Sequence, residues 1–320
     1  MPDLPHPDAP LPDARPTNWV DRHAPGPLKP WLKLGRFDRP IGIWLLMLPG
    51  WQGLALAFAT RNAPADWPRL IVLLAEFALG ATLMRAAGCA WNDIVDRDID
   101  AKVARTADRP IASGRISPKQ ALVFIAACCL LSLGILISLG PFAIALGAAS
   151  LILVVAYPFM KRITWWPQAW LGLTFNWGAL LGFAAVEGRL SAAAGLLYAS
   201  GLFWTLGYDT IYALQDIEDD VLVGVRSTAR RFGRRVPLAV FGFYAVSALL
   251  AFLVWIPDRP APVYLLFAAL YATHLSAQVQ RLRLDDPALA LRLFKSNRSA
   301  GLILFAGLLA AAWRQGAAGS

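Results

Sequence analysis

Long apolar stretches separated by short polar segments dominate the chain after residue 40. A helix needs about 20 mostly apolar residues to cross the hydrocarbon core of a bilayer. Nine stretches come close to this length: 40–60, 69–90, 119–139, 141–158, 167–186, 192–213, 237–256, 262–280 and 298–314. The pattern predicts an all-α, polytopic bundle of nine transmembrane helices, with a tight turn at "SLGP" between the third and the fourth.

Composition and charge agree with a membrane protein. Hydrophobic residues make up 57% of the chain and charged residues only 16%. Of the 30 Lys and Arg residues, 24 fall in the N-terminal tail and in the loops after even-numbered stretches, and 5 fall on the other side. Because cytoplasmic loops retain Lys and Arg, this bias predicts a cytoplasmic N-terminus and an outside C-terminus. The net charge of +9 follows this bias, and we expect no nucleic-acid partner.

Residues 1–30 form a Pro- and Asp-rich segment, which predicts a disordered tail before a single transmembrane domain at 31–316. The tail has no apolar core, so it is not a secretory signal, and it is too acidic for a mitochondrial transit peptide. We therefore expect a bacterial inner membrane, with the active site on its cytoplasmic side. The sequence predicts no oligomeric state.

The stretch "AWNDIVDRDID", Ala90 to Asp100, follows the second apolar stretch and is rich in aspartate. At about 100° per residue, one face of a helix collects Asn92, Asp93, Asp96 and Asp100. Asp98 falls on the opposite side. A random acidic loop has no reason to be sorted in this way.

A second acidic stretch, "YDTIYALQDIEDD", follows the sixth apolar stretch. Treated as a helix, it places Asp209, Tyr212, Asp216 and Asp220 on one face and Glu218 on the other. Both stretches follow even-numbered spans and share one membrane boundary, where we expect them to face each other. Carboxylate and amide oxygens suit Mg²⁺ together with substrate phosphates, so the two faces predict divalent ions that bridge a diphosphate. The alternative is that they are interfacial helix ends paired with loop arginines.

Basic residues accompany the acids, and one lies inside the second span. Positive-inside topology explains any single loop residue, but a group beside metal-type acids is typical of phosphate binding. The span arginine is expected to face the bundle interior. The candidates for substrate binding are Arg85, Lys102, Arg105, Arg109, Lys161 and Arg162.

The chain resembles the UbiA superfamily of intramembrane aromatic prenyltransferases. The resemblance runs from "LGRFDRPIGIWLLMLP" onward and includes "MRAAGCAWNDIVDRDID", "YPFMKR" and "YDTIYALQDIEDD". It implies a nine-helix bundle with a cavity open to lipid, and Mg²⁺-dependent transfer of a prenyl chain from polyprenyl diphosphate to 4-hydroxybenzoate in ubiquinone biosynthesis. It also implies roles for particular residues: Asn92, Asp93, Asp96 and Asp100 at a first metal site, Asp216 and Asp220 at a second, Asp96, Asp209 and Asp216 in catalysis, and Arg39 and Tyr212 at the substrates.

Two kinds of alternative remain open. Within the superfamily the acceptor can be haem, homogentisate or naphthoate. A secondary transporter is the alternative from another class, but it predicts acids near the bilayer midplane and an inverted repeat. The acids of this chain cluster at one membrane face, and the sequence has no internal repeat.

Overall fold

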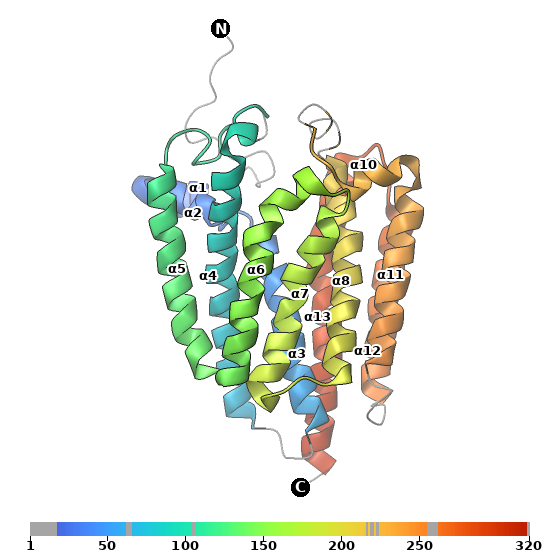
Figure 1. Ribbon diagram of the computed structural model, residues 1–320. Helices are drawn as coiled ribbons and strands as arrows, with labels where there is room; N and C mark the ends of the chain where they lie inside the picture. Colours follow the sequence, from blue (N-terminus) through green and yellow to red (C-terminus); the bar gives the residue numbers. More distant parts are fainter. Residues whose placement is uncertain are drawn as a thin grey trace. The chain divides into compact units, whose positions relative to one another are not determined.

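The computed structural model describes residues 18–61, 66–103, 106–215, 217, 221, 224–254 and 262–318, with side chains to residue 313. Within these ranges the fold is entirely helical (Figure 1). The chain divides into two compact units, one made of residues 1–43 and 80–134 and the other of residues 44–79 and 135–320. Expected sites at Arg105, Asp216 and Asp220 lie outside the described residues.

Nine helices of at least 18 residues occur in the described part of the chain, and each overlaps one predicted span. They are α3 (Ile41–Thr60), α4 (Trp67–Asp100), α5 (Pro118–Ser138), α6 (Pro141–Ile163), α7 (Pro167–Glu187), α8 (Ala192–Tyr212), α11 (Val236–Leu253), α12 (Pro262–Arg281) and α13 (Pro287–Ala318). Six segments of the described chain, in α3 to α7 and at Thr228–Leu253, are long and apolar enough to cross a membrane. The all-helical membrane class is thus confirmed, whereas the count of nine spans and their orientation stay predictions.

Proline explains where many of these helices begin. α5, α6, α7, α12 and α13 all start at a proline, whose missing N–H is not needed in the first turn and whose φ angle already suits a helix. Gly140 precedes α6 with φ +92°, so α5 and α6 are joined by the tight turn that the sequence predicted. Short elements complete the fold: α1 (Trp19–His23), η1 (Gly26–Leu28), α2 (Lys29–Leu34), η2 (Ala213–Gln215), α10 (Thr228–Phe232) and η3 (Gly233–Arg235).

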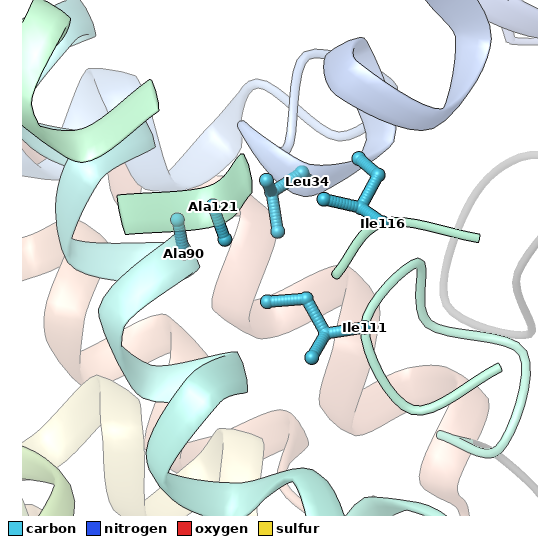
Figure 2. Close-up of a cluster of buried hydrophobic side chains, with 5 residues drawn as sticks. All are labelled: Leu34, Ala90, Ile111, Ile116 and Ala121. Carbon is cyan, nitrogen blue, oxygen red and sulfur yellow. The ribbon is translucent and has the colours of Figure 1, made fainter. Parts of the chain in front are cut away.

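The first unit has a small apolar core beneath its polar end. Figure 2 shows the side chains of Leu34 from α2, Ala90 from α4 and Ala121 from α5 together with Ile111 and Ile116 from the intervening loop. All five are at most 2% exposed. The core therefore anchors the loop after the first acidic motif on the helix that carries the motif.

In the second unit, α8 packs against α7, α11 and α13, while α12 packs against α11 and α13. Close approach of α3 to α7 depends on glycine, because a Cβ on Gly53 would collide with the carbonyl of Ala179 and one on Gly182 with the carbonyl of Gly50. Small residues at helix contacts are typical of membrane bundles, where backbone packing replaces the hydrophobic effect between helices. The unit is thus a helix bundle arranged around α8.

Candidate active site

The first acidic motif occupies the last turns of α4, which continues as a helix to Asp100. Asp93, Asp96 and Asp100 are only 1%, 0% and 5% exposed. Asn92 is half-buried, whereas the side chain of Asp98 is 81% exposed. The predicted sorting of these aspartates by helix face agrees with their burial.

Two arginines reach this acidic face. Nη2 of Arg36 lies 2.6 Å from Oδ1 of Asp93, and Nη1 of Arg109 lies 3.3 Å from the same oxygen. Nη1 of Arg109 also lies 2.8 Å from Oδ2 of Asp100. A buried carboxylate is costly unless it is paired and hydrogen-bonded, so these arginines account for the burial of Asp93 and Asp100.

The donor set suits Mg²⁺ in chemical type, because it consists of carboxylate and amide oxygens. Oδ2 of Asp93 is also buried without a hydrogen-bond partner. Among the described side chains, no group of three or more His, Cys, Asp or Glu residues is arranged to hold a metal ion. The face therefore offers suitable ligands, two of which are held by arginine.

Arg36 belongs to the turn between α2 and α3 and was not singled out from the sequence. Its φ of +61° is a left-handed conformation that non-glycine residues rarely adopt. Its Nη1 donates a hydrogen bond to the carbonyl of Lys33, at 3.1 Å. Arg39, the arginine that the sequence favoured in this turn, forms an ion pair with Asp38 at 3.2 Å. In the structure, Arg36 therefore forms an ion pair with the first acidic motif.

Asp38 is the other buried charge of this turn. It is 4% exposed, and its Oδ1 has no hydrogen-bond partner. Burial raises the pKa of Asp38 to about 6, although the charges of Arg36 and then Lys33 act in the opposite direction. The turn therefore holds a carboxyl group that titrates near neutral pH.

The remaining basic candidates of the first unit differ in their surroundings. Arg85 is half-buried and lies against the first turn of α3, where a Cβ on Gly42 would be 2.6 Å from its Nε. Glycine at position 42 thus makes room for this guanidinium group. Lys102, just past the end of α4, is exposed.

The second acidic motif begins on α8, where Asp209 and Tyr212 are half-buried. The ring of Tyr212 lies 4.5 Å from that of Phe294, centroid to centroid. α8 ends at Tyr212 and gives way to the 3₁₀ turn η2. The expectation of one continuous α-helix from Asp209 onward is therefore wrong at residues 213–215. A 3₁₀ turn advances about 120° per residue instead of the roughly 100° that the prediction assumed.

The "YPFMKR" segment at the end of α6 is fastened to the chain that follows the second acidic motif. The backbone N–H of Arg226 donates to the carbonyl of Lys161 at 3.0 Å, and its Nη1 donates to the carbonyl of Ile163 at 2.6 Å. The Arg226 guanidinium also lies 5.8 Å from the ring centroid of Trp165. The backbone that carries Lys161 and Arg162 is thus fixed, while Lys161 is half-buried and Arg162 is exposed.

A buried network of uncharged polar groups joins α8, α11, α12 and α13. Nε1 of Trp204 donates to Oδ1 of Asn297 at 2.7 Å, and the hydroxyl of Tyr244 donates to Oε1 of Gln278 at 2.9 Å. Nδ2 of Asn297 donates to Oε1 of Gln278 at 3.1 Å. This network was not predicted from the sequence, although a Gln and an Asn within apolar helices were a signal of it.

The UbiA prenyltransferase family model matches residues 46–313. The chain belongs to this family. A human protein named 4-hydroxybenzoate polyprenyltransferase, mitochondrial, is 48% identical over 288 residues, which cover 89% of this chain and 76% of the human one. The structure of a UbiA homolog from Aeropyrum pernix K1 has a TM-score of 0.70 and 25% identity, and covers 83% of this chain and 97% of its own. A UbiA homolog from Archaeoglobus fulgidus bound to GPP and Mg²⁺ has a TM-score of 0.60 and 19% identity, over 90% of this chain and 99% of its own, and supports the fold alone.

The expected location in a bacterial inner membrane is contradicted. The human, bovine and Arabidopsis thaliana relatives are all named mitochondrial. The expectation rested on the composition of residues 1–30. The composition of this segment does not identify the membrane that holds the helices. A multi-pass membrane protein remains supported.

Proposed function

We propose that the chain transfers a polyprenyl group from polyprenyl diphosphate to the ring carbon ortho to the hydroxyl of 4-hydroxybenzoate, a step in ubiquinone biosynthesis. The buried acidic face of α4 carries the proposal, because it combines oxygen ligands for a divalent cation with guanidinium groups for a phosphate. The family membership and the 48% identity to the human relative support the acceptor and the reaction.

The reaction breaks the allylic C–O bond, and the electron pair leaves with the diphosphate. The ring carbon then forms the new C–C bond with the allylic carbon, and a base takes up the proton that the ring carbon loses. Positive groups that stabilise the leaving diphosphate favour this cleavage. Arg109 suits such a role, since its guanidinium group is 17% exposed and lies 2.8 Å from Asp100 on the acidic face.

Mg²⁺, when bound, supplies Lewis acidity to the leaving diphosphate. Asn92, Asp96 and Asp100 would hold it at the first motif, and Asp216 and Asp220 at the second. Asp93 stands on the first face as well, but two arginines already neutralise it. Release of Asp100 by Arg109 would open this carboxylate to the ion and turn the guanidinium toward the phosphates.

The other sequence candidates are proposed in matching roles. Asp96, Asp209 and Asp216 are proposed as catalytic residues. Lys102, Arg105, Lys161 and Arg162 suit the diphosphate. Arg39 suits the diphosphate or the carboxylate of the acceptor, and Arg85 suits an acid or a substrate. The ring face of Tyr212 suits the positive charge that develops on the allylic carbon. The donor is amphipathic, with an apolar tail that belongs in lipid and a polyanionic head that belongs at the interface. A nine-span bundle with its N-terminus on the Lys- and Arg-rich side has the same polarity.

The test uses the full chain in lipid nanodiscs with labelled 4-hydroxybenzoate, Mg²⁺ and prenyl diphosphates of several lengths. Homogentisate and a dihydroxynaphthoate serve as rival acceptors. We expect prenylated 4-hydroxybenzoate, lost on chelation by EDTA and restored by Mg²⁺. Product from a rival acceptor alone would refute the acceptor assignment, and activity in EDTA would refute the metal requirement.

A further inference from the structure

Asp93 lies between two arginines. One of its oxygens, Oδ1, receives two guanidinium groups, at 2.6 Å from Arg36 and 3.3 Å from Arg109. The side chain is 1% exposed, and that of Arg36 is 9% exposed. Asp93 is therefore the point at which a turn 57 residues earlier and a loop 16 residues later are tied to α4.

The Arg36 side of this junction is fixed. Arg36 is held in a left-handed conformation, and its Nη1 is engaged by the carbonyl of Lys33. Strained backbone conformations persist only where the surrounding structure holds them, and they concentrate at functional sites. The ion pair with Asp93 restrains Arg36 through one nitrogen of its guanidinium group. The hydrogen bond to the carbonyl of Lys33 restrains it through another.

The Arg109 side can exchange partners. Arg109 is more exposed than Arg36, and its Nη1 is shared between Asp93 and Asp100. If Asp100 turned to a cation, Asp93 would still hold Arg109 beside the acidic face. A divalent cation bound to Asp93 would instead share this carboxylate with the buried guanidinium group of Arg36. The two positive charges would repel each other.

We infer that Asp93 is a positioning residue that, with Arg36 as its fixed counter-ion, holds Arg109 ready for the diphosphate, and that it is not a metal ligand. This inference deepens the proposed function and rests on it for the identity of the anion. Oδ2 of Asp93, buried without a partner, still requires a hydrogen-bond donor, and a water molecule can supply one.

The experiment separates metal binding from diphosphate binding in the full-length protein. Mn²⁺ binding without substrate is followed by electron paramagnetic resonance, and inorganic pyrophosphate binding at saturating Mg²⁺ by the shift in melting temperature. For Asp93→Asn we expect Mn²⁺ affinity within about twofold of the unmodified protein and pyrophosphate affinity about tenfold weaker. The KM for the prenyl diphosphate should rise in proportion, with a much smaller change in kcat, and Asp93→Glu should restore part of the loss.

Asp96→Asn is the comparison for a true ligand and should lose Mn²⁺ binding. Asp98→Asn is the matched control, because it removes the same charge from the exposed side of the same helix. Loss of Mn²⁺ binding in Asp93→Asn would overturn the inference, and so would unchanged pyrophosphate affinity.

If Asp93→Asn does not fold, Arg109→Lys carries the test. It keeps the charge but loses the forked guanidinium geometry, so it should weaken pyrophosphate binding and leave Mn²⁺ binding intact. Unchanged pyrophosphate affinity in Arg109→Lys would also overturn the inference. A protein that separates the two binding events in this way but prenylates no 4-hydroxybenzoate would refute the proposed function and leave the positioning role standing.

Discussion

At the end of α4 the buried carboxylates lie among arginines, whereas Trp204 and Tyr208 of α8 pack against aromatic rings and bond to uncharged groups. Around Asp93 and Asp100, three contacts of 2.6 to 3.3 Å join full charges. Around α8, Trp204 and Tyr208 are buried, and Trp204 contacts Asn297 through a neutral hydrogen bond. Both helices lead to an acidic motif, but the contacts described at the end of α4 join charges, whereas those that Trp204 makes on α8 are neutral.

This difference has an energetic consequence. Removing one partner of a buried ion pair leaves an uncompensated charge and costs about 3–5 kcal/mol. Neutral hydrogen bonds between membrane helices contribute only about 0.6 kcal/mol on average. Single substitutions in the first region should therefore lower the stability strongly, whereas those in the hydrogen-bond network of α8 should lower it only slightly.

The largest expected effect tests whether the two motifs serve one reaction. Asp96→Ala and Asp216→Ala should each lower Mg²⁺-dependent prenylation of 4-hydroxybenzoate by at least about 1,000-fold, because each removes a ligand or a catalytic carboxylate. Labelled product formed by purified membranes measures the activity, and monodisperse size-exclusion profiles check that the variants fold. Full activity in either variant would remove that motif from the active site.

A second comparison lies within the first motif and tests the helix-face argument. Asp100→Asn should lower kcat/KM by about 100-fold, whereas Asp98→Asn should change it by less than about threefold. Asp100 is 5% exposed and bonded to Arg109, but Asp98 points to solvent and pairs with Arg97. Equal losses in the two variants would show that burial on this helix has no functional meaning.

The burial pattern of these aspartates shows what periodicity can predict. Helix ranges, the turn at Gly140 and the solvent-facing position of Asp98 follow from apolar length, proline and 100° spacing, all of which are local in the sequence. The end of the regular helix at Tyr212 did not follow, because neighbours in the bundle decide whether such a stretch stays α-helical.

Partners distant in the sequence were the other limit. Periodicity does not reveal that Arg36 reaches Asp93, since the direction of its side chain depends on one left-handed residue in a turn. Arg36 and Arg39 are the same residue type and only three positions apart, so the sequence does not distinguish them. The buried link between Tyr244 and Gln278 depends likewise on how two helices face each other. The residue types indicated that basic groups accompany the acids. They did not indicate that Arg36 is an arginine that pairs with Asp93.

A third prediction concerns Asp38 and the stability of the charged region. Its pKa of about 6 lies above the ordinary value of 3.8, so the folded state binds this proton more tightly than the unfolded state does. The stabilisation of the folded state by this proton is complete below about pH 4 and is lost as the pH rises through 6. The free energy of unfolding falls by roughly 3 kcal/mol at most over this range. Melting temperatures measured from pH 4 to 7 should therefore fall less steeply with rising pH in Asp38→Asn than in the unmodified protein. Identical slopes would contradict the raised pKa, and Asp98→Asn serves as the control for loss of one carboxylate.

The smallest effect is expected in the neutral network around α8. Tyr244→Phe removes a hydroxyl whose hydrogen bond to Gln278 is 2.9 Å long, but it keeps the ring that fills the space beside Gly207. Asn297 still donates to the same Gln278 oxygen at 3.1 Å, so the acceptor retains a partner. We expect a loss of only about 0.6 kcal/mol, read as a shift of a few degrees at most in the melting temperature, with the KM for both substrates unchanged. A loss above about 3 kcal/mol would place Tyr244 in the class of the buried ion pairs and would remove the energetic distinction between the two regions.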